Sequence, residues 1–457
     1  MLNEKVRAYL DSHRPEHLAM LKELLAMPSI SAQPDHLADC VACAQWLADR
    51  FTETGLAARL DHCPGQPLVV AHSPRRPDRP TLLVYGHYDV QPPEPLDQWT
   101  SPPFEPTERG GDLVARGASD DKGPMLTWLI AARAWRQATG DWPVNLVFLI
   151  EGQEETGSPA LETFIAGASD ELACHRIAIS DTTFHADGVP SITYGLRGLV
   201  YAQVTITGPA HDLHSGRYGG IVRNPLHVLA GLIAGLHDTS GRVTLAGFYD
   251  DVVAPSPAER AAWDRLGLDE AQLQREIGVD ALAGEAGFST LERLWARPCL
   301  DCNGLWGGYT GPGPKTVIPS WAKAKLSVRL VGHQRPQDVL AGLEAYFQSG
   351  CPAGTRADLE PLAADEPWLM SPDDPGLDLA RAAMAEAFAR PCALIRGGAS
   401  VPVTSLFHRH LGVHPLMMGY GLPDDRIHSP NEKFRLDHFY RGAVASAALM
   451  QNLAEAT

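Results

Sequence analysis

Apolar residues follow two different patterns along the chain, and the change between them divides the sequence. In the first part, continuous apolar runs predict buried strands, which alternate with segments of helical periodicity. The predicted strands are LVVAHSP at 68–74, TLLVYGHYDV at 81–90, NLVFLIE from residue 145, and RIAISDT at 176–182. A helix is expected at 122–140, ended by Gly140, and this alternation of strands and helices indicates a mainly parallel α/β sheet.

Beyond Gly195 the strands are expected to be half-exposed. The segments LVYAQVTITGP and AKAKLSVRLVG alternate apolar and polar residues, as antiparallel strands with one open face do, and each is followed by a helical pattern. Helix, strand and helix then return near the C-terminus. We therefore expect a catalytic α/β domain formed by residues 1–196 and 367–457, interrupted by a smaller α+β domain of residues 197–366.

Composition excludes several classes of partner. The 457 residues include 38 Lys and Arg against 55 Asp and Glu, a net charge of −17, which repels phosphate backbones and anionic lipid. We expect neither a nucleic acid nor a membrane partner, since no apolar run approaches the ~18 residues of a membrane span. The N-terminus has an amphipathic helical pattern without a leader peptide, and the eight scattered cysteines suit a reducing compartment. These features predict a soluble, cytoplasmic protein.

Polar residues gather where the predicted strands end, and the carboxyl ends of parallel strands form the active-site edge of open α/β sheets. Singly, a His, an Asp pair before a helix or a Glu pair in a loop has an ordinary structural explanation. Together, they would concentrate negative charge that requires a cation. Imidazole and carboxylate groups suit zinc, with manganese or cobalt as alternatives. The residues are His87, Asp89, Asp120, Asp121, Glu154, Glu155 and Asp181, with His428 nearer the C-terminus.

Five short motifs give these residues a familiar order. GHYDV, RGASDDKGP, EGQEETGS, ISD and IHSPNE follow one another along the chain. The chain thereby resembles the co-catalytic zinc peptidases that include carnosinase, cytosolic non-specific dipeptidase, aminoacylase, acetylornithine deacetylase and succinyl-diaminopimelate desuccinylase, and within them the dipeptidase branch. The resemblance covers nearly the whole chain. It implies a zinc-exopeptidase-type catalytic domain with an inserted lid and dimerisation domain, and hence a homodimer.

The resemblance also implies a role for each motif residue. Asp120 would bridge two metal ions, His87 and Asp181 would complete one site, and Glu155 and His428 would complete the other. A cis peptide bond is implied between Asp120 and the next residue.

The same resemblance makes Glu154 the general base and Asp89 the partner of the His87 ring. Two metal ions can acidify a shared water and polarise the scissile carbonyl. A carboxylate beside that water can pass its proton to the leaving amine. The Asp89 carboxyl can accept the other ring N–H of His87 and fix its tautomer.

The inserted domain supplies further candidates by resemblance. His214, in GPAHDLHSG, would reach the partner subunit's active site and stabilise an oxyanion, with a turn-capping role as the alternative. Arg329, in LSVRLV, would bind the substrate's C-terminal carboxylate through a bidentate pair, with an ordinary surface arginine as the alternative. Asn303, Thr316 and Ser400 lie in segments that resemble substrate-lining loops.

The sequence thus predicts a homodimeric two-metal dipeptidase acting on small peptides. The alternative is an N-acyl-amino-acid deacylase or carboxypeptidase of the same family, because IRGGASVPV has Arg396 and Gly397 where dipeptidase relatives tend to carry an acid that could bind a free amine. In favour of a substrate with a free amine, the resemblance places Asp181 at a ligand position where aminopeptidases and dipeptidases of the family usually have Asp. Glutamate-releasing carboxypeptidases and deacylases often have Glu there. A non-catalytic binding or scaffold protein with this fold is a remote alternative, because all five ligands and the base are present.

Overall fold

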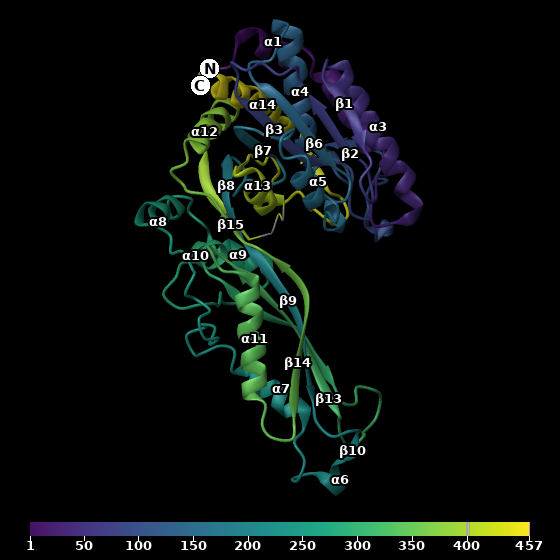
Figure 1. Ribbon diagram of the computed structural model, residues 1–457, viewed down its shortest axis with the longest axis vertical. Coiled ribbons are helices and arrows are strands. Elements are labelled where there is room, and N and C mark those ends of the chain that lie inside the picture. Colours follow the sequence, from purple (N-terminus) through teal and green to yellow (C-terminus); the bar gives the residue numbers. More distant parts are fainter. Residues whose placement is uncertain (399–400, 402, 457) are drawn as a thin grey trace. The chain divides into compact units, whose positions relative to one another are not determined.

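The chain forms two compact units, and Figure 1 colours them along the sequence. The computed structural model describes residues 1–398, 401 and 403–456. Unit 1 consists of Met1–Tyr194, Met370–Ile395 and Val403–Thr457, and unit 2 of Gly195–Leu369 and Arg396–Pro402. Unit 2 therefore interrupts unit 1 in the sequence. Contacts also assign to unit 2 the short segment from Arg396, which the division predicted from the sequence leaves in the catalytic part.

The main sheet, most of which belongs to unit 1, has a parallel centre. Within the described residues nine strands form it, in the order β1-β2-β6-β3-β7-β17-β8-β15, with β16 paired to β8. The neighbours β6, β3, β7 and β17 run parallel, whereas β2 and β8 flank them in antiparallel pairings. The predicted α/β class is confirmed. The strands are β1 Ala57–Asp61, β2 Leu68–His72, β3 Thr81–His87, β6 Asn145–Glu151, β7 Arg176–Ile179, β8 Ser191–Leu196, β15 Trp368–Leu369, β16 Ala393–Gly397 and β17 Pro415–Met417.

Helices on both faces explain why β3 and β6 are buried at every position. Successive side chains of a strand point to opposite faces. Tyr85 of β3 meets Phe407 of α13 (Val403–Leu411) edge-on, while the next residue, Gly86, lies against α4 (Lys122–Thr139). A Cβ at Gly86 would lie 2.7 Å from the Met125 side chain, so glycine permits this close packing. Helix α4 ends as predicted, because Gly140 caps it with a left-handed φ of 82°.

Other helices of unit 1 complete this packing, with α14 against α4 and α12, and α1 against α4. They are α1 Glu4–Ser12, α2 Arg14–Leu25, α3 Leu37–Glu53, α5 Leu161–Gly167, α12 Pro375–Phe388 and α14 Leu436–Glu455. A small antiparallel sheet in the order β18-β5-β4 consists of β4 Thr107–Arg109, β5 Asp112–Val114 and β18 Lys433–Arg435. It joins two segments that are far apart in the sequence, because Lys433 pairs with Val114.

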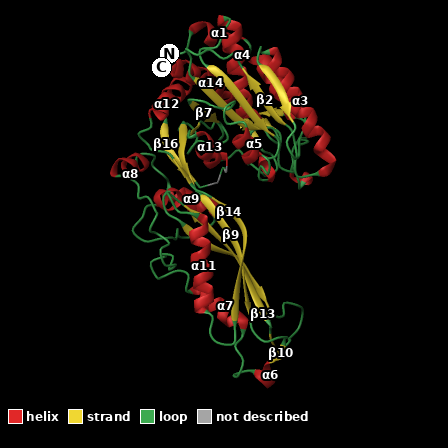
Figure 2. Cartoon of the chain, in the orientation of Figure 1, coloured by secondary structure: helices red, strands yellow, loops and turns green. Residues whose placement is uncertain are grey.

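Unit 2 is built on an antiparallel sheet with one covered face, shown as yellow strands beside red helices in Figure 2. Its order is β11-β13-β9-β14, and β9 and β13 alternate buried with more exposed residues, as predicted. Helices α7 and α11 pack on the covered face. The elements are α7 Pro225–Ala234, α11 Pro336–Gly350, β9 Gly198–Thr207, β11 Cys299–Gly307, β13 Trp321–Leu330 and β14 Arg356–Asp365.

Short elements fill the rest of unit 2. Strands β10 (Leu213–His214) and β12 (Val317–Ile318) pair with each other. Helix α6 (Ser215–Tyr218) begins directly after β10 and contacts both strands. Three short helices between α7 and β11 were not predicted from the sequence, and they are α8 Pro257–Asp264, α9 Glu270–Ile277 and α10 Thr290–Trp295. Among the residues described, no helix is both long and apolar enough to cross a membrane.

Candidate metal centre

The carboxyl ends of three neighbouring parallel strands position most of the predicted ligands. His87 is the last residue of β3, and Asp181 follows two residues after the end of β7. Glu154 and Glu155 open the 3-10 turn η3 (Glu154–Thr156), three residues after β6. Because β6, β3 and β7 run parallel and pair directly, these side chains meet at one edge of the sheet.

Two loops bring the remaining ligands to the same edge. Asp120 lies just before α4, and the Asp120–Asp121 peptide bond is cis, as the resemblance implies. His428 lies in the loop between β17 and β18 and adopts a left-handed φ of 60°. The five predicted ligands therefore come from five separate segments of unit 1.

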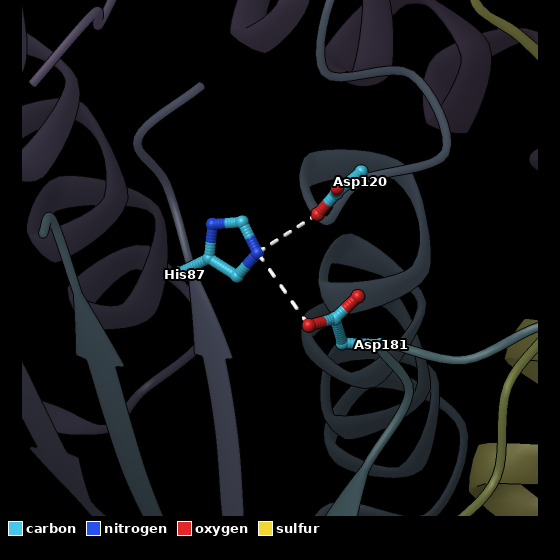
Figure 3. A group of neighbouring side chains, drawn as sticks. All are labelled: His87, Asp120 and Asp181. Carbon is cyan, nitrogen blue, oxygen red and sulfur yellow. Dashed lines mark hydrogen bonds and ion pairs between the residues drawn. The ribbon is translucent and has the colours of Figure 1, made fainter. Parts of the chain in front are cut away.

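In the first ligand group, two carboxylates face the same nitrogen of the His87 ring, as Figure 3 shows. Its Nε2 atom lies 3.0 Å from Asp120 Oδ1 and 3.7 Å from Asp181 Oδ2. The imidazole is completely buried, whereas the two carboxylates retain a small exposed fraction. One nitrogen and two carboxylate oxygens thus converge on one point.

The second ligand group uses the other oxygen of Asp120. His428 Nε2 lies 2.9 Å from Asp120 Oδ2 and 3.2 Å from Glu155 Oε2. Gln91 Nε2 donates to the same Glu155 oxygen at 2.7 Å and orients that carboxylate. Because Asp120 Oδ1 faces His87 while Oδ2 faces His428, one carboxylate is shared by the two groups.

The chemistry of both groups fits divalent metal ions. Within each group the candidate ligand atoms all lie within 4.8 Å of one another. Burial acts to lower the pKa of His87, but hydrogen bonds to Asp120, Asp181 and Asp89 outweigh it and raise that pKa well above its usual value. The carboxylates therefore favour a positive charge between them, which a metal ion supplies. Imidazole with carboxylate is a ligand set typical of zinc, and it also suits manganese or cobalt.

Asp89 connects the His87 ring to the turn that carries Glu154 and Glu155. His87 Nδ1 lies 3.1 Å from the Asp89 carbonyl oxygen and 3.4 Å from its Oδ1 atom, so the carbonyl is the nearer acceptor. The Asp89 carboxylate accepts Ser31 Oγ at 2.6 Å and the backbone N–H groups of Glu154 and Glu155 at 3.2 Å each. The carbonyl of Asp89 thus orients the His87 ring, and its carboxylate holds the turn of Glu154 and Glu155 beside the candidate metal sites.

Glu154 is half-buried beside the first ligand group. Burial and the charges of Asp181, Asp120 and Glu155, opposed by the charge of His87, together raise its pKa to about 8. Its carboxyl group therefore lies within the electrostatic field of the ligands. Its role as general base stays a prediction.

His214 belongs to unit 2 and is exposed. Its Nδ1 atom accepts the backbone N–H of Gly216 at 3.0 Å, so it caps the short helix α6. This contact is the one that the turn-capping alternative expects. A second role toward a partner subunit stays a prediction.

The other unit 2 candidates occupy different settings. Arg329 lies half-buried on the less covered face of β13, paired in register with Cys299 and Leu199. Asn303 is exposed at an irregularity in β11, and Thr316 is exposed just before β12. Ser400 lies outside the described residues. The substrate contacts predicted for these residues stay predictions.

A comparison with protein families shows the family to which the chain, and with it this site, belongs. A model described as Peptidase family M20/M25/M40 matches residues 83–452, which include all five candidate ligands. The chain belongs to this family. Relatives of the chain are named metallodipeptidases, so the predicted family and the predicted enzyme class, a hydrolase of peptide bonds, are confirmed.

Similar M20 proteins extend this match over almost the full chain. The Cys-Gly metallodipeptidase dug1 of Schizosaccharomyces pombe is 30% identical over 469 residues, covering 99% of this chain and 98% of that protein. The human Beta-Ala-His dipeptidase is 33% identical over 476 residues, covering 99% and 93%. The solved structure of the M20 metallo-carboxypeptidase Sso-CP2 from Sulfolobus solfataricus has a TM-score of 0.83 and 30% identity, covering 96% of this chain and 99% of that one.

Sequence reasoning missed some buried residues around the M20 peptidase site. Glu432, in the IHSPNE motif, and Arg116, in RGASDD, form an ion pair of 2.7 Å whose side chains are each about 1% exposed. Their positions inside the RGASDD and IHSPNE motifs are the one signal in the sequence that could have singled them out. A second buried acid, Glu151 at the end of β6, accepts the Tyr85 hydroxyl and Ser158 Oγ.

Proposed function

We propose that this M20 peptidase is a two-metal dipeptidase that hydrolyses the amide bond of small peptides. The observation that carries the proposal is the shared Asp120, whose two oxygens face separate His-carboxylate groups. The relatives named Cys-Gly metallodipeptidase and Beta-Ala-His dipeptidase, which the chain matches over nearly its whole length, support the dipeptide substrate.

His87, Asp120 and Asp181 would hold one metal ion, and Asp120, Glu155 and His428 the other. Zinc is the proposed metal because it favours nitrogen and oxygen ligands of this kind, while manganese and cobalt are alternatives. When bound, the ions polarise the scissile carbonyl and lower the pKa of water.

Glu154 would move the proton of the reaction. Its carboxylate takes a proton from the attacking water and delivers it to the nitrogen of the leaving amine. Asp89 keeps Glu154 in place by accepting its backbone N–H, and it holds the His87 ring through Nδ1. The general base and a metal ligand therefore share one anchoring residue.

Unit 2 would recognise the peptide. Arg329 pairs with the C-terminal carboxylate through its planar guanidinium. His214, the last residue of β10 and the cap of α6, acts in the active site of a partner subunit, which makes the enzyme a homodimer. Asn303, Thr316 and Ser400 line the substrate site. A cytoplasmic location is supported by the eight cysteines, all of which are free.

A carboxypeptidase or N-acyl-amino-acid deacylase is the second candidate function. The similarity to the carboxypeptidase Sso-CP2 favours it. So does Arg396, because its guanidinium donates to Glu259 and lies 5.2 Å over the Trp263 ring. This position therefore carries a paired cation, whereas an acidic residue there could bind the free α-amine of a dipeptide.

Hydrolysis of matched substrates tests both functions. Chelator-treated protein is assayed on unblocked dipeptides and on their N-acetylated forms, with zinc, manganese or cobalt added back. Cleavage restored by metal and limited to unblocked dipeptides supports the dipeptidase, and cleavage of the blocked forms alone supports the second candidate. Failure to cleave either set with any metal would contradict the two-metal function.

A further inference from the structure

Glu432 is a buried carboxylate at the centre of the loop that carries Asp120. Its Oε2 atom accepts the backbone N–H of Gly117 at 2.9 Å, and its Oε1 atom accepts those of Ser119 at 2.9 Å and Asp120 at 3.1 Å. Arg116 Nη1 donates to Oε2 at 2.7 Å. Four donors from five consecutive residues therefore surround one side chain that is more than 300 residues away in the sequence.

Such a ring of backbone N–H groups is an anion-binding concavity, and here it is filled by the chain's own carboxylate. Gly117 adopts a left-handed φ of 79°, which turns its N–H inward, and a Cβ there would lie 2.6 Å from the Val90 side chain. The loop conformation before α4 is thus shaped around Glu432. Because one of the four donors is the N–H of Asp120 itself, Glu432 fixes the backbone from which the shared ligand projects.

The same carboxylate belongs to the segment that carries His428, four residues earlier in the chain. Two further links join this segment to the Asp120 loop. Ser119 Oγ donates to Asp425 Oδ2 at 2.8 Å, and Lys433 pairs with Val114 in the β5–β18 ladder. These contacts hold the segments together on both sides of His428.

We propose that Glu432 is a positioning residue that sets the separation of Asp120 from His428 and thereby lets the second ligand group retain its metal ion. The inference rests on the proposed two-metal function. Glu432 holds the backbone of Asp120, which both groups share, and it lies four residues after His428, which belongs to the second group alone. Loss of its carboxylate therefore weakens the Asp120–Glu155–His428 group more than the group of His87 and Asp181, although both share Asp120.

Removing an ion pair that only stabilises the fold should leave metal binding unchanged, and unit 2 contains such a pair for comparison. Glu285 accepts Arg297 Nε and Nη2 at 2.8 Å each, and it is 8% exposed. Like Glu432, it is a buried glutamate paired with an arginine, but it belongs to the other unit. Glu285→Gln is therefore the control for the general cost of removing a buried charge.

The experiment titrates Co²⁺ into metal-free, full-length wild type, Glu432→Gln and Glu285→Gln. Equilibrium dialysis gives the number of ions and their affinities, the visible absorption of Co²⁺ reports each ligand group, and circular dichroism reports folding. Gln keeps the size of the side chain but replaces one acceptor oxygen with a donor. We expect two ions in each protein, with the second bound about 10- to 100-fold more weakly in Glu432→Gln alone.

Ser119→Ala keeps the proposal testable if Glu432→Gln does not fold. It removes only the bond to Asp425, so we expect the second ion to bind about fivefold more weakly and the first to be unchanged. Wild-type affinity for both ions in the folded Glu432→Gln protein would overturn the inference, as would unchanged binding by Ser119→Ala if that variant alone folds. A wild type that binds fewer than two ions would instead overturn the two-metal function on which the inference rests.

Discussion

The main sheet and the sheet of unit 2 place polar side chains in different ways. Every residue of β3 and β6 is buried, because helices such as α4 and α13 cover both faces. In unit 2, β9 and β13 bury only alternate residues, because α7 and α11 cover one face. The first sheet therefore has room for chemistry only where its strands end, whereas the second also offers side chains along an open face.

This difference suggests a division of work. Strand ends and neighbouring loops gather side chains from several segments around one point, which suits metal ligands and a general base. An open sheet face carries side chains in rows, which suits contacts along a substrate or a partner. Variants at the strand ends should then remove catalysis, while variants on the open face should change binding.

The largest effect is expected for Asp120→Asn. An amide is a poorer ligand for both metal ions, so the variant should lose most of a rate enhancement that in enzymes is at least about 10⁶-fold. Metal analysis and the rate of dipeptide hydrolysis check this. If Asp120→Asn retains two ions and wild-type turnover, the assignment of catalysis to the strand ends is wrong.

Glu154→Gln and Glu155→Gln form the next test, because the two residues are neighbours in η3 with different predicted roles. Glu154→Gln should keep both ions and lower kcat by about 10²- to 10⁴-fold, since it loses the proposed general base. Glu155→Gln should lower metal content as well. Parallel metal analysis and kinetics separate the roles, and equal metal loss in both variants would contradict the assignment.

The close packing of unit 1 also predicts a dependence of stability on pH. His17 of α2 is 3% exposed and stacks near His13 and Tyr9, and burial, with the charges of His13 and Arg133, lowers its pKa to about 4. The unfolded chain has the usual pKa of about 6.5, so it takes up the proton first as the pH falls. Its contribution to stability is therefore present above pH 6.5 and lost progressively toward pH 4, by about 3 kcal/mol.

Urea denaturation at several pH values measures this loss. His17→Leu should flatten the pH dependence between 6.5 and 4, whereas His36→Gln, at a half-exposed position, should leave it close to wild type. An unchanged slope in His17→Leu would show that other groups carry the acid sensitivity of unit 1.

The smallest effect is expected on the open face of unit 2. Arg329→Ala should raise KM for dipeptides by about 10- to 100-fold with less change in kcat, since hydrogen bonds to a charged group contribute about 1.5–3 kcal/mol. Lys325→Ala, on the same face of β13, is the matched control. Dipeptide amides, which lack the carboxylate, should be cleaved by wild type and Arg329→Ala with similar KM, and a difference there would argue against carboxylate binding.

The sequence predicts the first sheet better than the surroundings of its site. Burial on both faces leaves an uninterrupted apolar run, so TLLVYGH and NLVFLIE locate β3 and β6, and the polar residues after them locate the site. The sequence pattern alone does not show that Asp120 is the shared carboxylate, because this depends on the directions in which its two oxygens point. Only the family resemblance predicted it.

Other features leave a weaker trace or none. Glu432 acts on backbone N–H groups, which every residue other than proline has, so its partners have no sequence signature. The nearer acceptor for His87 is a carbonyl, which any residue could supply at position 89. Helices α8 and α10 are too short to show a clear period, although their capping boxes, which begin at Ser256 and Ser289, are visible as S-x-x-E.

The position of β17 in the main sheet has a consequence for how the protein is made. β17 pairs with β7 on one side and β8 on the other, yet it is encoded at Pro415–Met417, after the whole of unit 2. Pro415 lies 236 residues after Ile179, and a ribosome that adds roughly 5–20 residues per second needs roughly 12–50 s to cover that distance. Throughout that interval the edge of β7 lacks its β17 neighbour, and an unpaired strand edge is a template for pairing with another chain.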